Sequence, residues 1–468
     1  MATFQLTDGQ DEITGTAGDD TIEGGPGTLS TFDTIDGGAG FDTLNTAVDQ
    51  NGVQAPTISN VEEILLDTGG QPFDVSNISG AESIGTNGPS ITLENIDEND
   101  LNTRFDAIDV QSGTVKLQFA DGVLDAPDDR LRFLAEGANV TFTSDSTFDS
   151  TADGEQNETP DTERVEEIQI SLRGSNPEAE FDNQVDISDF SAIETLVLKG
   201  DANSKVVVDS PELATIIASG TSGGVTITSD TSTDTTFRGG SGGDDLKTGT
   251  GNDDVKGGEG DDVLNVGGGD NTVRGNEGDD EITAEAGNDL LDGGDGADTI
   301  DAGSGEDIVL GGGGGDTLNG GGGNDKINGG DGADQIDGGG GNDRLSDGAG
   351  DDEVRGGAGR DIFVAGAGND TLFGEGGQDS FLFTTDDFGD DTVEDYELTA
   401  NTDTNDGVAF RFDGAFEVLR SQSDFEAFYD ANQASGRVTA DQANSTFTVE
   451  ADGGTFTLNA SDLDFLFS

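Results

Sequence analysis

The chain reads Gly239-Gly-Ser-Gly-Gly-Asp-Asp-Leu-Lys247, then Thr248-Gly-Thr-Gly-Asn-Asp-Asp-Val-Lys256, then Gly257-Gly-Glu-Gly-Asp-Asp-Val-Leu-Asn265. The same frame of nine continues to residue 382 without insertion or deletion, so 144 residues form sixteen units. The fourth position is always Gly, and the sixth is Asp in all units but one, where Asn271 stands. The eighth is always Leu, Ile, Val or Phe. A flexible Gly-rich linker needs no such phase, so the pattern predicts a folded repeat.

The spacing of these residues indicates a chemistry. Positions seven to nine predict a three-residue strand whose eighth residue points inward, and positions one to six predict a turn in which glycines allow positive φ. If eighteen residues make one coil, Asp298, Asp316 and Asp334 stack on one side, and the aspartates of the intervening units stack on the other. Carboxylates about 4.8 Å apart repel each other by roughly 1 kcal/mol even in water. A cation between the turns reverses this repulsion, and an all-oxygen site suits Ca²⁺.

The frame Gly-Gly-x-Gly-x-Asp-x-(large apolar)-x resembles the nonapeptide of the repeat-in-toxin (RTX) calcium-binding proteins. The resemblance implies a parallel β-roll, roughly 38 Å long at sheet spacing, with one Ca²⁺ between successive turns on each side. The expected metal ligands are the aspartates of the array and four from a degenerate copy near the N-terminus: Asp11, Asp20, Asp33, Asp42, Asp244, Asp253, Asp262, Asp280, Asp289, Asp298, Asp307, Asp316, Asp325, Asp334, Asp343, Asp352, Asp361, Asp370 and Asp379.

Four segments are predicted in an all-β chain. Residues 1–45 form a short, degenerate set of calcium-binding repeats, and residues 237–382 form the β-roll. Between them, residues 46–236 hold short β-branched runs separated by turns, which favours a β-solenoid or β-helix-like region, with a β-sandwich as the alternative. Residues 383–468 are richer in Phe and predict a β-rich cap over the open end of the solenoid.

Within the cap, apolar alternation predicts antiparallel strands at 408–412, 447–449 and 456–458. Residues Ser423–Ala431 predict a short helix, with Ser423 as its N-cap.

Composition narrows the function classes. The chain has 99 acidic and 19 basic residues, a net charge of −80, and no Cys, His or Trp. Such a chain does not bind nucleic acid or an anionic membrane through its own charge, and its folding is expected to depend on a metal. The missing His excludes HExxH zinc proteases, Ser-His-Asp triads and histidine-ligated zinc, and the missing Cys excludes disulfides.

The sequence also bears on location. No run is long enough to span a membrane, and the first residues lack the basic and apolar regions of a Sec signal. The ending Asp462-Leu-Asp-Phe-Leu-Phe-Ser468 is similar to the uncleaved C-terminal signal of RTX proteins. We therefore expect export by the type I secretion machinery and a secreted, extracellular or cell-surface location.

The roll, solenoid and cap account for nearly the whole chain, so we expect a structural protein without catalysis. Residues 46–236 resemble the solenoid regions of bacterial surface-layer (S-layer) proteins of the RTX type. This resemblance implies a subunit that folds and self-associates on Ca²⁺, as a homo-oligomer or lattice, with Ca²⁺ bridging acidic subunits to each other or to surface glycans. The alternatives are a calcium-dependent adhesin or glycan-binding surface protein, and an RTX-tailed polysaccharide-modifying enzyme.

Three features offer starting points for the enzymatic alternative. Gly239-x-Ser241-x-Gly243 matches a hydrolase elbow but has no His partner. Glu62 and Glu63 are adjacent, and neighbouring strand residues face opposite sides, so they are poorly placed to act on one bond. Tyr396 and Tyr429 fall in the predicted cap rather than in the solenoid.

Overall fold

The computed structural model describes most of the 468 residues. The described residues are 1–48, 56–68, 72–86, 91–96, 104–108, 113–119, 130–136, 139–144, 167–173, 183–187, 193–208, 213–229, 232–383, 389–396, 407–412, 415–433, 437–441, 446–451 and 454–459. The predicted secretion signal at Asp462–Ser468 lies outside them.

The chain divides into two compact units, Met1–Thr248 and Gly249–Ser468. This division falls inside the nonapeptide array. The four-segment organisation stays a prediction.

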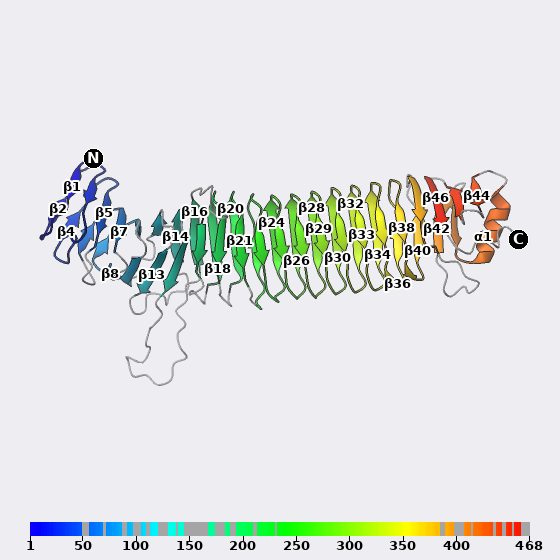
Figure 1. The fold of residues 1–468 in the computed structure, drawn as a ribbon, viewed down its shortest axis with the longest axis horizontal. Helices are drawn as coiled ribbons and strands as arrows, with labels where there is room; N and C mark the ends of the chain where they lie inside the picture. Colours follow the sequence, from blue (N-terminus) through cyan, green and yellow to red (C-terminus); the bar gives the residue numbers. More distant parts are fainter. Residues whose placement is uncertain are drawn as a thin grey trace, which may run out of the picture. The chain divides into compact units, whose positions relative to one another are not determined.

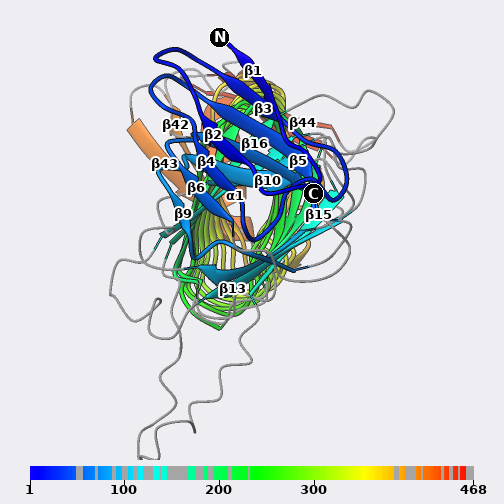
Figure 2. The same cartoon turned by 90° about the vertical axis from the view of Figure 1, so that its left-hand side faces the viewer.

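The first unit is built from three sheets of parallel strands. One sheet contains β1 (Thr3–Gln5), β3 (Thr21–Glu23), β5 (Thr43–Ala47), β7 (Glu63–Asp67), β10 (Ser83–Thr86), β12 (Arg104–Ile108), β14 (Arg130–Glu136), β16 (Glu167–Arg173), β18 (Thr195–Gly200), β20 (Thr215–Thr221) and β22 (Thr236–Arg238). A second contains β8 (Pro72–Asp74), β11 (Ile91–Ile96), β13 (Gly113–Phe119), β15 (Asn139–Ser144), β17 (Asn183–Asp186), β19 (Ser204–Val207), β21 (Val225–Thr228) and β23 (Asp245–Lys247). A third contains β2 (Glu12–Thr14), β4 (Thr34–Asp36), β6 (Thr57–Ser59) and β9 (Ile78–Ser79), which lie side by side in Figure 2.

Consecutive strands in the chain alternate between sheets, and each pairs in parallel with a strand one coil away. This is the geometry of a β-solenoid, because a sandwich of hairpins would give antiparallel neighbours. The predicted solenoid is therefore confirmed for the described part of residues 46–236, and the sandwich alternative is wrong there. Coil length varies in this region: Thr195 pairs with Thr215, whereas Arg130 pairs with Glu167.

The second unit continues the pattern in two main sheets. The first contains β24 (Asp254–Glu259), β26 (Thr272–Glu277), β28 (Leu290–Asp295), β30 (Ile308–Gly313), β32 (Lys326–Asp331), β34 (Arg344–Ala349), β37 (Ile362–Val364), β40 (Ser380–Phe383), β42 (Gly407–Phe412) and β43 (Ala415–Leu419). The second contains β25 (Val263–Asn265), β27 (Glu281–Thr283), β29 (Thr299–Asp301), β31 (Thr317–Asn319), β33 (Gln335–Asp337), β35 (Glu353–Arg355), β38 (Thr371–Phe373), β41 (Gly389–Val393), β46 (Gly454–Asn459), β45 (Thr446–Glu450) and β44 (Val438–Asp441). A pair of two-residue strands, β36 (Ala358–Gly359) and β39 (Gly376–Gly377), lies outside them.

Register in this unit confirms the predicted coil of eighteen residues. Leu318 pairs with Ile300 on one side and Ile336 on the other. Figure 1 shows strands β24, β26, β28, β30, β32 and β34 following one another along the array. Strands β25 to β38 of the second sheet have the predicted three residues, but β24 to β34 of the first have six and extend into the next unit. The turn predicted for positions one to six is therefore partly strand on that side.

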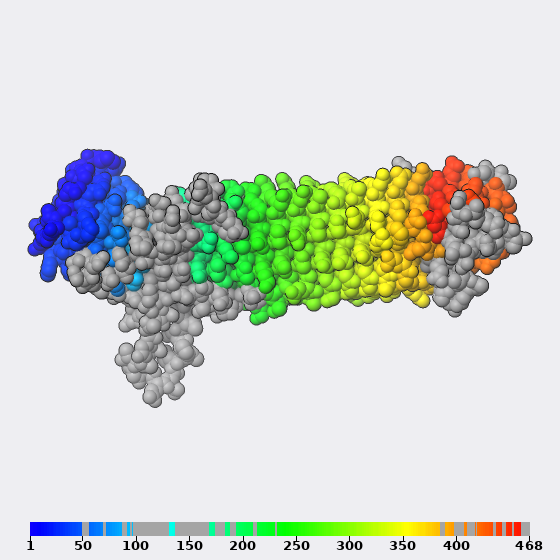
Figure 3. All heavy atoms as spheres, in the orientation of Figure 1, coloured from blue at the N-terminus to red at the C-terminus, as the bar shows by residue number. Residues whose placement is uncertain are grey.

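The core is made by the eighth residues of the repeat, and the turns are tightly stacked. Leu318, Ile300 and Ile336 are 1 to 2% exposed, as predicted for inward-facing positions. Figure 3 shows the coils of residues 249–383 as contiguous bands. Gly312 and Gly314 have φ of 114° and 140°, and a Cβ on either would collide with the carbonyl oxygen of a glycine one coil before. A larger residue there would force the turns apart.

The C-terminal part of the second unit ends the parallel stacking. Strand β43 is antiparallel to β42, and β44, β45 and β46 form an antiparallel set. Helix α1 (Gln422–Asn432) buries Phe425, whose ring lies 5.8 Å from that of Tyr396 and 5.2 Å from that of Phe447. The predicted strands and helix are present, but Ser423 lies inside the helix. The N-cap is Ser421, whose side chain accepts the N–H of Asp424.

Candidate metal centre

A single turn of the array shows how each aspartate is placed. Asp316 follows a glycine-rich turn and is 1% exposed. Its Oδ1 accepts the backbone N–H of Asp298 at 2.8 Å, and its own N–H donates to Oδ1 of Asp334 at 2.9 Å. Its Oδ2 points toward the space beside Gly311, where a side chain would meet it, and the carbonyl of Gly329 also faces that space. The turn therefore fixes one oxygen and leaves the other facing a small, oxygen-lined space.

This arrangement recurs along two columns in the second unit. Each N–H···Oδ1 bond joins residues of adjacent coils at 2.7 to 3.0 Å. One column runs through Asp262, Asp280, Asp298, Asp316, Asp334, Asp352, Asp370 and Asp391. The other runs through Asp253, Asn271, Asp289, Asp307, Asp325, Asp343, Asp361 and Asp379. All of these side chains are 1 to 3% exposed, so the structure brings the predicted residues together as two buried columns.

The second carboxylate oxygen is the informative atom. A buried polar atom without a partner costs about 1–3 kcal/mol, and more when it is charged, so it normally has a partner. Yet Oδ2 is buried without a hydrogen-bond partner in Asp280, Asp289, Asp298, Asp307, Asp316, Asp325, Asp334, Asp343, Asp352, Asp361, Asp370 and Asp391. Repeated from coil to coil, these atoms fit ligands of a hard cation such as Ca²⁺, which takes six to eight oxygens from carboxylates and carbonyls.

Asn271 provides an internal comparison, because it replaces the carboxylate with an amide. Its Oδ1 keeps the column by accepting the N–H of Asp253 at 2.9 Å. Its Nδ2 donates to the carbonyls of Gly269 at 3.0 Å and Gly267 at 3.4 Å. The carbonyls of the second and fourth positions thus face the atom at the end of the sixth side chain. An aspartate at the same position has a carboxylate oxygen in place of Nδ2, and a bound cation would satisfy that oxygen together with carbonyls such as these.

Burial changes the acidity of the columns in the absence of an ion. Burial raises the pKa of Asp298 to about 7; repulsion from Asp280 and Asp316 adds to this, and the N–H of Asp280 partly offsets it. Burial likewise raises the pKa of Asp343 to about 7 and that of Asp307 to about 6. The metal-free roll therefore disfavours its own charged state near neutral pH.

These pKa values predict how the metal-free protein responds to acid. Asp298, Asp307 and Asp343 have pKa values of about 6 to 7 in the fold and about 3.9 when unfolded. The free-energy penalty of burying these carboxylates is therefore largest above pH 7 and disappears toward pH 4. Protein stripped of calcium should therefore gain β structure as the pH falls from about 7 to about 5, as measured by circular dichroism. A titration in high salt serves as the control. Salt screens the repulsion between surface charges but does not change the cost of burying the aspartate carboxylates. A metal-free β signal that stays constant over this range would contradict the prediction.

The N-terminal aspartates differ from the array in one respect. The N–H of Asp11 donates to Oδ1 of Asp33 at 2.8 Å, and that of Asp20 donates to Oδ1 of Asp42 at 2.7 Å, so the columns are present. In Asp11, Asp20 and Asp33, however, Oδ2 accepts a backbone N–H from its own turn. Only Asp42, among these four, has a buried Oδ2 without a partner. In the other three turns a backbone N–H already occupies Oδ2 of the aspartate. The role of Asp11, Asp20, Asp33 and Asp42 as metal ligands stays a prediction.

Asp244 lies in the first unit, where its Oδ1 accepts the N–H of Val225 at 2.9 Å and its Oδ2 that of Gly240 at 3.2 Å.

Sequence reasoning missed Asp391, which continues the first column beyond the array. Its Oδ1 accepts the N–H of Asp370 at 3.0 Å, and Val393 pairs with Leu372. The signal was present: Gly389-Asp-Asp391-Thr-Val393 repeats positions four to eight of the nonapeptide. An insertion after residue 383 shifts the frame and hides this further unit.

The family comparison agrees with this geometry. Residues 6–44, 238–273, 274–309, 310–345 and 346–381 match the model of the RTX calcium-binding nonapeptide repeat (4 copies). These repeats belong to the RTX family. RTX nonapeptides bind calcium, and proteins that carry them are generally secreted. Among curated proteins, none matches the chain. Among the residues that the structure describes, no helix is long and apolar enough to cross a membrane.

Proposed function

We propose that this protein is a secreted structural subunit that folds on Ca²⁺ and assembles with copies of itself in a surface layer or related extracellular structure. The observation that carries the proposal is the pair of aspartate columns with partnerless Oδ2 atoms, because they make the fold itself depend on the ion. Successive ions between the turns then act as structural elements of the solenoid.

Glu62, Glu63 and Tyr396, which the enzymatic alternative would use, contact neighbouring residues of the fold. Glu62 accepts the N–H of Asp42 at 2.7 Å, and Glu63 accepts the hydroxyl of Thr43 at 3.2 Å. Tyr396 is 2% exposed and packs in the aromatic cluster with Phe381 and Phe425. These contacts favour a structural role for the same residues.

Charge supports assembly through calcium. With a net charge of −80, copies of the chain repel each other until cations reduce the charge or bridge carboxylates between them. Export by a type I system belongs to the same proposal, as does the absence of catalysis.

Electron microscopy of purified full-length protein tests this proposal. We expect ordered sheets or filaments at millimolar Ca²⁺, and dispersed protein in chelator or in equimolar Mg²⁺, which demands a tighter octahedral shell. The proposal would be contradicted if the protein folded on calcium but light scattering showed that it remained a monomer. If that monomer bound a defined sugar on a glycan array, it would be a calcium-dependent adhesin.

A further inference from the structure

Asp347 stands at the first position of its nonapeptide, where no other unit of the array has a charge. That position is otherwise Gly, Ala, Thr or Val. In the preceding coil of the same column the residue is Gly329, and a Cβ there would meet Oδ2 of Asp334. The first position therefore faces the carboxylate of the sixth, and Asp347 brings a third carboxylate to a place where the repeat has two.

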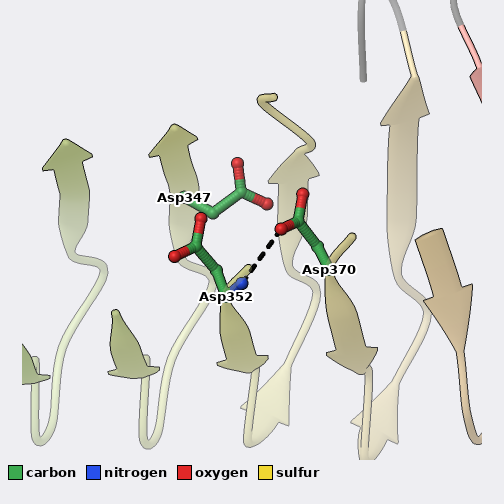
Figure 4. A group of neighbouring side chains, drawn as sticks. All are labelled: Asp347, Asp352 and Asp370. Atoms are coloured by element: carbon green, nitrogen blue, oxygen red, sulfur yellow. Dashed lines mark hydrogen bonds between the residues drawn. The ribbon is translucent and has the colours of Figure 1, made fainter. Parts of the chain in front are cut away.

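Three acidic side chains from two adjacent coils converge at this point. One carboxylate oxygen from each of Asp347, Asp352 and Asp370 lies within 4.8 Å of the other two. Figure 4 shows the three side chains gathered at adjacent turns. All three residues are 1 to 3% exposed. Calcium–oxygen distances are about 2.3–2.6 Å, so ligands on opposite sides of one ion are about 5 Å apart. A single Ca²⁺ can therefore contact one oxygen from each residue.

Backbone hydrogen bonds fix the three carboxylates in these positions. Oδ1 of Asp347 accepts the N–H groups of Gly348 at 2.8 Å and Gly366 at 2.6 Å. Oδ1 of Asp352 accepts the N–H of Asp334 at 2.8 Å, and Oδ1 of Asp370 accepts that of Asp352 at 3.0 Å. The site is thus preorganised by neighbouring coils, which lowers the cost of ordering ligands on binding.

Two oxygens in the cluster point to a ligand. Oδ2 of Asp352 and Oδ2 of Asp370 are buried and have no hydrogen-bond partner. Among the described residues, no lysine or arginine forms an ion pair with the three aspartates. Three carboxylates held this closely without a cation are strongly unfavourable.

We propose that Asp347, Asp352 and Asp370 form a three-carboxylate Ca²⁺ site that binds more tightly than the other sites between the turns. The proposal rests on the calcium dependence proposed above and adds a specific residue to it. Calcium affinity rises with the number of charged ligands, and Asp347 adds a third carboxylate to the two that the repeat provides. The site should therefore fill at a calcium concentration at which the remaining turns are still empty.

The test is a calcium titration of the stripped full-length protein in competition with a chromophoric chelator, which counts ions by affinity class. Wild type should bind one ion at least about tenfold more tightly than the rest. Asp347→Asn removes the charge, and Asp347→Gly restores the residue most common at this position. Both should lose that one tight ion and still fold at high calcium. Asp337→Asn is the matched control, because Asp337 is exposed, and it should keep the tight ion.

The outcomes separate the two proposals. If wild type binds calcium in a single affinity class that Asp347→Gly leaves unchanged, the three-carboxylate site is wrong but calcium-dependent folding stands. If the tight ion survives in both Asp347 variants, the site is also wrong. If wild type binds no calcium at all, the proposed function fails and this site fails with it. If Asp347→Asn does not fold, Asp347→Gly decides, because it keeps the glycine turn of the repeat.

Discussion

In calcium chelator, the full-length chain is expected to lose most of its β structure, and millimolar Ca²⁺ should restore it. The reason is the pair of buried columns in which a carboxylate oxygen lacks a partner at nearly every coil. Each coil of the array contributes only a few apolar residues to offset this cost, and its glycines raise the entropy cost of folding. Coils contact only their neighbours, so loss of the ions should unfold the array rather than a single turn.

Circular dichroism during a calcium titration measures this effect, and size-exclusion chromatography checks that compaction accompanies it. Sodium chloride at matched ionic strength is the first control, because it screens the net charge without providing a ligand. Mg²⁺ is the second, and it should substitute poorly. Identical spectra in chelator and in Ca²⁺ would rule out calcium-dependent folding, and restoration by sodium chloride alone would attribute it to charge screening.

Leu318→Asp should have the second large effect. Leu318 is 1% exposed and lies between Ile300 and Ile336 of the neighbouring strands. The change removes a buried apolar side chain, which costs about 2–5 kcal/mol, and adds a buried unpaired carboxylate, which costs several kcal/mol more. The calcium concentration needed for folding should therefore rise strongly, or the β signal should not return at all.

Thr317→Asp is the matched control, since it adds the same charge to the adjacent residue of β31. Thr317 is exposed, and its neighbours Thr299 and Gln335 are uncharged, so the added carboxylate stays in water. This variant should fold near the wild-type calcium midpoint. If Leu318→Asp titrated like Thr317→Asp, the eighth position would not face the core and the coil register would be wrong.

The sequence alone determined the repeating part of this protein, because a period of nine with one apolar and one acidic position leaves few arrangements. Two units close one coil, so residues eighteen apart must stack, and this placed Leu318 in the core and Asp316 in a column. The same logic failed where the period breaks. The insertion after residue 383 hid Asp391, although its local motif matches the repeat.

Only the tertiary structure decided where residues at equivalent positions of the motif adopt different structures. The two halves of a coil share one motif, yet β30 extends over six residues and β31 over three. Gly312 and Gly313 pair with the next coil as part of the ladder of β30, whereas the turn after β31 pairs with the next coil only through the isolated bridge between Gly322 and Gly340. Ser421 rather than Ser423 caps α1, because Ser421 and Asp424 exchange hydrogen bonds at the position where the chain enters the helix.

Asp347 shows the same limit most clearly. The sequence shows an aspartate where the repeat has a small residue, but its partner Asp370 is more than a coil away in the chain. Folding places them together because each coil stacks directly on the last, and the N–H of Gly366 holds the carboxylate of Asp347 in place. A local pattern fixes which side of the coil a residue faces, whereas stacking decides which charges meet.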